Sequence, residues 1–215
     1  DGPLMEFVYL LTQTQTLPER LQGQVARIEK EVRMGSSPDE LRLLQLVSVA
    51  SAYGARLCTR ELLSTLNLPA ANRTLTQFEK EYLLRRSEDG FYLEGLHPVR
   101  SQILSSLLIQ PDITPWLEIA AQAMPLMPEE DLETFILHAF VEQPEEYKNI
   151  LEQVKMLTPH SWPGIAGLLR CLLWAGVKDY ITENDAIIEE AYEVLGPAWW
   201  FTLDLNFSLE YEALK

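Results

Sequence analysis

Apolar residues recur at intervals of three and four along most of the chain, which is the spacing of an amphipathic helix. The apolar segment from Pro3 to Leu11 predicts one such helix, with proline in its first turn. A second is predicted after Thr16 and ends near Gly35. The next helices are predicted at about 39–53, at 60–66 with Thr59 as its cap, and from Asn72 or Thr74 to about Tyr82.

Residues 83–101 break this helical spacing. Two short apolar runs flank Asp89-Gly90, a dipeptide that readily supplies the positive φ angles of a tight turn, and they predict a hairpin over about 83–96. The chain then enters His97-Pro98 and an amphipathic segment that continues to Leu108. Helix, helix, helix, hairpin is the order of a winged-helix domain, in which the hairpin is the wing. The pattern therefore predicts a helical leader at 1–36 and a winged-helix domain at 37–110.

From Pro111 onward the spacing is again helical and is interrupted by prolines. Short connections between such helices imply antiparallel neighbours, as in a bundle or a short α-solenoid. The predicted helices lie at about 115–124, 129–142, 145–157, 162–176, 183–195 and 198–212. The last is ambiguous, because apolar and polar residues alternate from Phe201 to Glu210 as in a strand; we favour a helix because no partner strand is predicted. The predicted fold is mainly α, with residues 111–215 forming an acidic helical domain.

Charge separates the two halves of the chain. The formal net charge is −15; residues 1–110 hold 12 Lys and Arg against 13 Asp and Glu, and residues 111–215 hold 5 against 19. This balance opposes binding to DNA or to an anionic membrane surface, and the asymmetry predicts two functional halves. Cys58 and Cys171 lie in apolar contexts predicted to be helical, and no apolar run is long enough to span a bilayer. We therefore expect a cytoplasmic protein without disulfides.

Residues that could carry chemistry are few. The glycines form neither a Gly-x-x-x-x-Gly-Lys-Ser/Thr nor a Gly-x-Gly-x-x-Gly loop, and no complete catalytic site is predicted. His138 and His160 lack the neighbouring ligands that zinc requires, so no metal site is predicted. His97 has two ring nitrogens that suit contact with a phosphate, but the residues alone favour a structural role for it at the corner between hairpin and helix beside Pro98.

Basic and aromatic residues offer two further candidate surfaces. DNA-binding winged helices contact phosphates from the third helix and the wing, but Glu79, Glu81 and Glu88 lie between the basic residues there and favour an ordinary solvated surface. The basic residues in question are Arg73, Lys80, Arg85, Arg86 and Arg100. All five tryptophans follow Pro111, and most are expected in the core. Trp199 and Trp200 cannot both point inward from one helix, so this pair is a candidate interface.

Asp1-Gly2-Pro3, followed by a winged helix that ends in Gly95-Leu96-His97-Pro98, resembles the STAND class of signalling NTPases, in particular its bacterial antiviral members. In that class a nucleotide-binding domain precedes a small helical domain, whose Gly-Pro step lies against the adenine. A winged helix follows, and its Met-His-Asp histidine contacts the β-phosphate in the resting state. The resemblance implies that Pro3 is the adenine-side proline and His97 the phosphate-sensing histidine. It covers Asp1 to about Leu108, and Leu-His-Pro departs from the motif at its third position.

The resemblance implies a non-catalytic regulatory segment cut from a longer polypeptide. Its winged helix would gate the nucleotide state of an upstream domain that binds ATP or ADP with magnesium. The helical half would connect to a downstream sensor of a trigger such as a phage protein, and the active parent would be a homo-oligomer. Two alternatives stay open: a fragment of a winged-helix transcriptional regulator that reads DNA through its third helix, and a helical adaptor for protein interaction.

Overall fold

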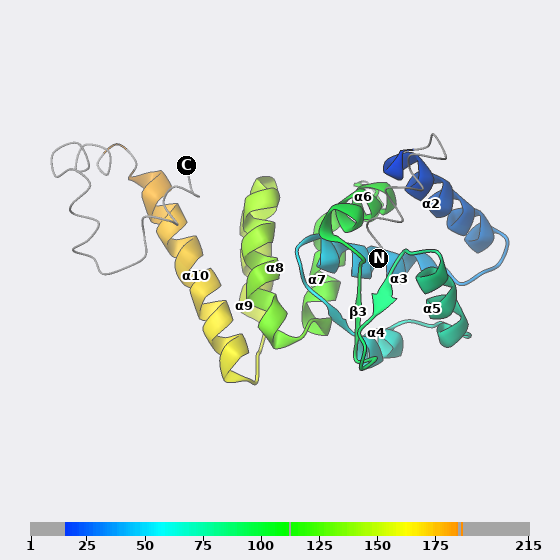
Figure 1. Ribbon diagram of the computed structural model, residues 1–215. Helices are drawn as coiled ribbons and strands as arrows, with labels where there is room; N and C mark the ends of the chain where they lie inside the picture. Colours follow the sequence, from blue (N-terminus) through cyan, green and yellow to red (C-terminus); the bar gives the residue numbers. More distant parts are fainter. Residues whose placement is uncertain (1–15, 112, 185, 187–215) are drawn as a thin grey trace. The chain divides into compact units, whose positions relative to one another are not determined.

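The computed structural model describes residues 16–111, 113–184 and 186. The protein is mainly helical with a small three-stranded antiparallel sheet (Figure 1). Two compact units are present, Asp1–Gly167 and Leu168–Lys215. Pro3, the Trp199-Trp200 pair, the helix predicted at 198–212 and nearly all of the helix predicted at 183–195 lie outside the described residues.

The elements follow one another with short connections. In chain order they are α2 (Leu17–Arg33), α3 (Asp39–Ala52), β1 (Leu57–Cys58), α4 (Thr59–Thr65), α5 (Ala71–Lys80), β2 (Arg85–Arg86), β3 (Tyr92–Glu94), α6 (Pro98–Leu108), α7 (Trp116–Ala123), the 3-10 turn η1 (Met124–Leu126), α8 (Glu129–Glu142), the 3-10 turn η2 (Pro144–Glu146), α9 (Tyr147–Met156) and α10 (Trp162–Glu183). The boundary between the two units falls within α10, after Gly167.

Helix α3 forms the centre of the first unit. Its ten residues from Leu43 to Ala52 are all buried, as expected of a helix that other elements surround. It packs most extensively against α6, and then against α7. Both α3 and α6 bury small side chains, among them Ser51 and Ser101, which allow a close approach of the backbone near the end of the hairpin.

The sheet confirms the predicted hairpin and adds a strand to it. Strand β3 lies in the middle and pairs antiparallel with β2 on one side and β1 on the other, so that Leu93 faces both Arg86 and Leu57. Gly90 has a φ of +75°, as the Asp-Gly turn predicts. Strand β1 was not predicted, because two residues are too few to show an alternating pattern. Cys58 consequently lies on a strand and not, as expected, on a helix.

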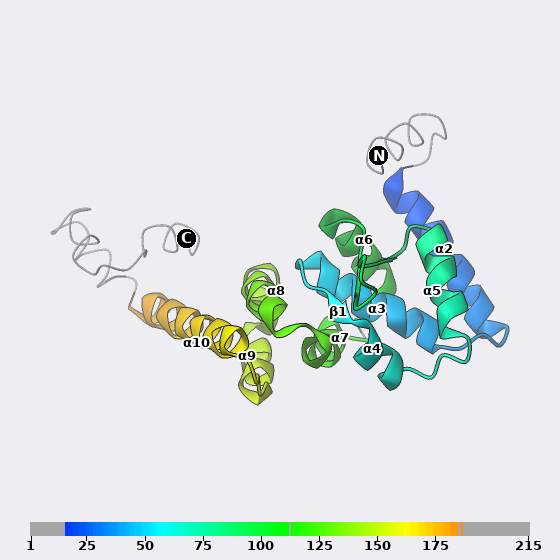
Figure 2. The same cartoon turned by 60° about the horizontal axis from the view of Figure 1, so that its bottom comes forward.

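Helix α2 begins as its sequence predicts. The hydroxyl of Thr16 accepts from the Glu19 amide at 3.5 Å, and the Glu19 carboxylate accepts from the Thr16 amide at 2.8 Å, which forms a capping box. Gln24 and Arg27 of α2 contact Glu81 at the end of α5, beside which α2 lies (Figure 2). The predicted cap of α4 is wrong, because this helix begins at Thr59 itself. Helix α5 begins at Ala71, one residue before the earlier of its two predicted starts, and neither helix has a side-chain cap.

Aromatic packing joins α7 and α8 to the end of α3. The rings of Trp116 and Phe135 are stacked with centroids 6.4 Å apart, and both rings meet Tyr53 edge to face. Helix α8 has the predicted bounds, whereas α10 extends seven residues beyond the predicted end at 176. Most tryptophans were expected in the core, but of the three among the described residues Trp162 is 75% exposed and Trp116 and Trp174 are only half-buried.

The described part of the second unit is the remainder of α10. Its exposed side chains include Leu169, Leu173 and Tyr180, and the Lys178 ammonium lies 5.1 Å from the centre of the Trp174 ring. Within residues 16–111, 113–184 and 186, no helix combines the length and the apolar character needed to cross a membrane. Cys58 and Cys171 are both free thiols.

Candidate functional site

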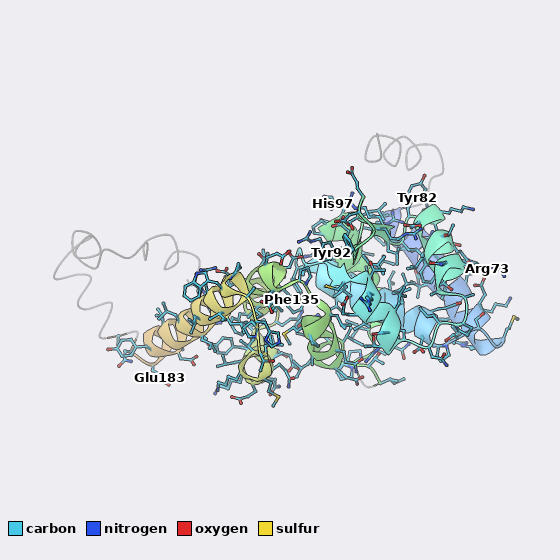
Figure 3. The ribbon with its side chains drawn as sticks, turned by 90° about the horizontal axis from the view of Figure 1, so that it is seen from below. Arg73, Tyr82, Tyr92, His97, Phe135 and Glu183 are labelled. Atoms are coloured by element: carbon cyan, nitrogen blue, oxygen red, sulfur yellow. The ribbon has the colours of Figure 1, made fainter. Side chains whose placement is uncertain are left out.

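His97 lies at the junction of the hairpin and α6, where it is exposed to solvent (Figure 3). It is the N-cap residue of α6, and Pro98 occupies the first helical position. Its Nδ1 accepts a hydrogen bond from the Val99 amide at 3.2 Å, and its carbonyl accepts from the Ser101 amide at 3.0 Å. The bond from the Val99 amide thus gives His97 a structural role at the corner between the hairpin and α6, as the sequence suggested.

The cap defines which nitrogen of His97 can bind a ligand. Because Nδ1 accepts a hydrogen bond, the ring proton of neutral His97 resides on Nε2, which can donate to an anion. The N-terminus of α6, which has eleven residues, adds partial positive charge beside the ring. The local role and the anion-binding role therefore use different nitrogens and are compatible.

Gly95 fixes the path of the chain into His97. Its amide donates to the Ser51 hydroxyl at 2.7 Å. A Cβ at position 95 would lie 2.1 Å from Ser101 Oγ and 3.1 Å from Ser51 Cβ, so only glycine fits between α3 and α6. Sequence reasoning did not identify Ser51 or Ser101, because nothing in a single sequence places them against residue 95.

Of the basic residues that a DNA-binding winged helix would use, Arg100 is buried, and the two arginines of the hairpin are paired with glutamates. Arg86 binds the Glu79 carboxylate through two nitrogens at 2.7 and 2.6 Å, and these bonds lower the pKa of Glu79. Arg85 pairs with Glu94 at 2.9 Å. Arg100 is 3% exposed in α6. Arg73 and Lys80 are exposed on α5, and Figure 3 shows the labelled Arg73 well apart from His97.

A second cluster, centred on Arg56, was not predicted. Arg56 lies between α3 and β1 and binds Asp131 of α8 through its side chain and its own backbone amide. Its guanidinium also lies over the ring of Tyr92 on β3, 4.5 Å from the centroid. Hydrogen bonding to Asp131 raises the pKa of Arg56, which stays charged at all accessible pH values. The sequence holds no signal for this cluster, because 75 positions separate Arg56 from Asp131.

The remaining histidines take part in local contacts. His138 is exposed on α8, and its Nδ1 lies 2.8 Å from the Thr134 carbonyl oxygen. The backbone amide of His160 donates to Glu129 at 2.7 Å. Among the described residues, no group of three or more His, Cys, Asp or Glu side chains is arranged to hold a metal ion.

No family model, curated protein or solved structure matches the chain. The functional argument consequently depends on the residues and contacts described above. The two features that carry it are the exposed His97 at the start of α6 and the sheet that leads into it.

Proposed function

We propose that this chain is a non-catalytic regulatory segment of a STAND-type NTPase, in which His97 contacts a phosphate of the nucleotide held by an upstream domain. The order α3, β1, α4, α5, β2, β3 and the sheet order β1-β3-β2 support a winged-helix interpretation of this region. In that interpretation α5 is the third helix and the β2–β3 hairpin is the wing.

The observation that carries the proposal is the arrangement of His97. The histidine follows the hairpin directly, it is exposed, and its capping bond leaves Nε2 as the donor. A donor beside a helix N-terminus suits a phosphate oxygen, because the ring proton and the helix dipole both favour negative charge there. The nucleotide itself would be ADP or ATP with magnesium, held by residues outside this chain.

A winged helix that reads DNA is the alternative with a specific observation in its favour, the exposed Arg73 and Lys80 on α5. Two observations weigh against it. Arg85 and Arg86 of the hairpin are already paired with glutamates, and the net charge of −15 opposes approach to a polyanion. We therefore place the nucleotide-gating role first and the DNA-binding role second.

The first test concerns the gene that encodes this chain. The reading frame upstream of Asp1 should encode a Gly-x-x-x-x-Gly-Lys-Ser/Thr loop, whose backbone amides hold the phosphates. The 215-residue chain alone should not hydrolyse ATP, since it lacks that loop. Phosphate release by a pure sample with magnesium and ATP would contradict the proposal.

The second test measures release of a fluorescent ADP analogue from the polypeptide that includes the upstream domain. Replacing His97 by Ala or by Asn removes the Nε2 donor, and either change should accelerate release by about tenfold or more, as expected for loss of a hydrogen bond to a charged group. His97→Asn is the informative variant, because Asn keeps a side-chain acceptor for the helix cap. Unchanged ADP release in both variants would show that His97 does not contact the nucleotide and serves only as the N-cap of α6.

A further inference from the structure

Arg56 connects α8 to the chain just before β1. Its amide and its Nε both donate to Asp131 Oδ2, at 3.0 and 2.8 Å, and a terminal nitrogen donates to Oδ1 at 3.0 Å. The same terminal nitrogen lies 3.3 Å from a Glu130 oxygen. Because one carboxylate binds both the backbone and the side chain of Arg56, Asp131 fixes the position of this segment as well as that of the guanidinium.

Arg56 also connects to the hairpin by two routes. The guanidinium lies over the Tyr92 ring of β3, and Cys58, two residues after Arg56, is the register partner of Tyr92 in the sheet. One arginine therefore contacts the first turn of α8 and the central strand of the sheet at once.

The path from β3 to His97 is short and tightly packed. Strand β3 ends at Glu94, and the next residue, Gly95, is held by Ser51 with no room for a Cβ. His97 follows two residues later. The tightly packed residues between β3 and His97 cannot rearrange to compensate for a shift of β3, so such a shift also moves the histidine.

We propose that the Asp131–Arg56–Tyr92 cluster couples the helical array to the hairpin, so that displacement of the first turn of α8 changes the position of the strand that leads to His97. The significance for nucleotide gating rests on the proposed function, but the coupling itself is a property of this chain. It would let a partner bound to α8 or α9 act on His97 without touching it.

The chain holds a matched contact for comparison. Arg42 of α3 pairs with Glu118 of α7 at 2.9 Å and so also joins the α3 region to the second half of the unit, but its hydrogen bonds are to Gln45, Glu118 and Gln122 and not to the sheet. Breaking the Arg42–Glu118 pair should loosen the contact between α3 and α7 without a specific effect on the hairpin.

The experiment is amide hydrogen exchange of the 215-residue chain without nucleotide, comparing peptides from the hairpin with peptides from α2. Asp131→Asn should raise the exchange rate of residues 92–96 about tenfold or more above any change in α2, since opening of the hairpin loses its connection to α8. Arg56→Lys should act in the same direction, because lysine keeps the charge but cannot bind Asp131 through two nitrogens or stack its plane on the ring. Glu118→Gln should change the two sets of peptides equally.

A double-mutant cycle assigns the route through the ring. In a Tyr92→Leu background, Asp131→Asn should have a smaller effect on residues 92–96, because only the route through the pairing of β1 with β3 remains, whereas in a Tyr92→Phe background it should act as in the wild type. The coupling is refuted if Asp131→Asn leaves hairpin exchange at the wild-type rate, if it raises exchange evenly along the chain, or if its effect persists undiminished in Tyr92→Leu. A coupled hairpin with unchanged ADP release in the His97 variants would instead reject the proposed function and leave the coupling intact.

Discussion

At the scale of single residues, steric crowding at Gly95 determines the path of the chain that leads to His97. Gly95 lies against Ser51 and Ser101, and its amide is satisfied by the Ser51 hydroxyl. The conformation at residue 95 does not require glycine, since its φ is not positive; the restriction is steric. A change at this residue therefore tests packing rather than backbone freedom.

Gly95→Ala should lower the free energy of unfolding by about 1–3 kcal/mol, the usual cost of forcing extra atoms into a packed interior. Gly23→Ala is the matched control, because Gly23 lies exposed in α2 and a methyl group added there would have nothing within 4 Å, so that helix propensity predicts a gain of about 1 kcal/mol. Urea denaturation of both variants measures the two changes. Equal stability of Gly95→Ala and the wild type would show that α3 and α6 can separate at no cost.

His97 has a structural contribution that can be separated from any role toward a nucleotide. His97→Ala loses the bond from the Val99 amide and should cost about 1 kcal/mol of stability, while His97→Asn should stay within a few tenths of the wild type. Thermal unfolding of the isolated chain compares the two variants. If both are as stable as the wild type, the capping bond contributes nothing in solution.

At the scale of elements, the sequence predicted those whose signals are local. Helix α2, helix α8 and the turn at Gly90 follow from residues next to one another in the chain. Strand β1 and the Arg56 cluster escaped prediction, because each is defined by partners more than thirty positions away. The position of His97 at a helix start was predictable from His-Pro; the residues that hold it there were not.

The start of α10 depends on a carboxylate from another helix. Glu129 of α8 accepts hydrogen bonds from the amides of His160 and Ser161, each at 2.7 Å, and from the Ser161 hydroxyl. These bonds, led by the one from His160, lower the pKa of Glu129 from its ordinary value of 4.5. Gly164 and Gly167 lie close to Glu129 and Glu133, which brings the first turns of α10 against α8.

Acid should therefore loosen the first turns of α10. A carboxyl group with a lowered pKa in the folded state contributes stability that is fully present above about pH 4.5 and is lost as the pH falls through the lowered value. Protection of residues 160–167 against hydrogen exchange, taken relative to the intrinsic exchange rate at each pH, should fall over this range in the wild type, and the fall should be smaller in Glu129→Gln, which no longer titrates. Glu145→Gln, an exposed acid on η2, should keep the wild-type pH dependence. Identical profiles for all three proteins would contradict this assignment.

At the scale of the whole molecule, charge distinguishes between the functional alternatives. The chain carries a net charge of −15, and the two arginines of the hairpin are paired with glutamates. A DNA-binding winged helix needs these positions free to neutralise phosphates. The order of helices and strands alone does not distinguish a domain that regulates nucleotide binding from a domain that binds DNA, because the same architecture can host unrelated functions.

We expect no submicromolar binding to duplex DNA at physiological salt, measured by fluorescence anisotropy with duplexes of varied sequence. Neutralising the paired acids in Glu79→Gln and Glu94→Gln frees Arg86 and Arg85 and should raise any weak binding and its salt dependence. Tight, sequence-dependent binding by the wild type would favour the transcriptional regulator over the regulatory segment of an NTPase.

The two-residue strand β1 has a consequence for the order in which the protein folds. Leu57 of β1 can pair with Leu93 of β3 only when these distant parts of the chain meet. The chain between them forms two helices and most of a hairpin. Closing so long a loop for so few hydrogen bonds is unfavourable until α6 has docked on α3 and brought the ends together. Strand β1 is therefore expected to pair with β3 only after the folding transition state. Shortening the Leu57 side chain would then accelerate unfolding far more than it slows folding.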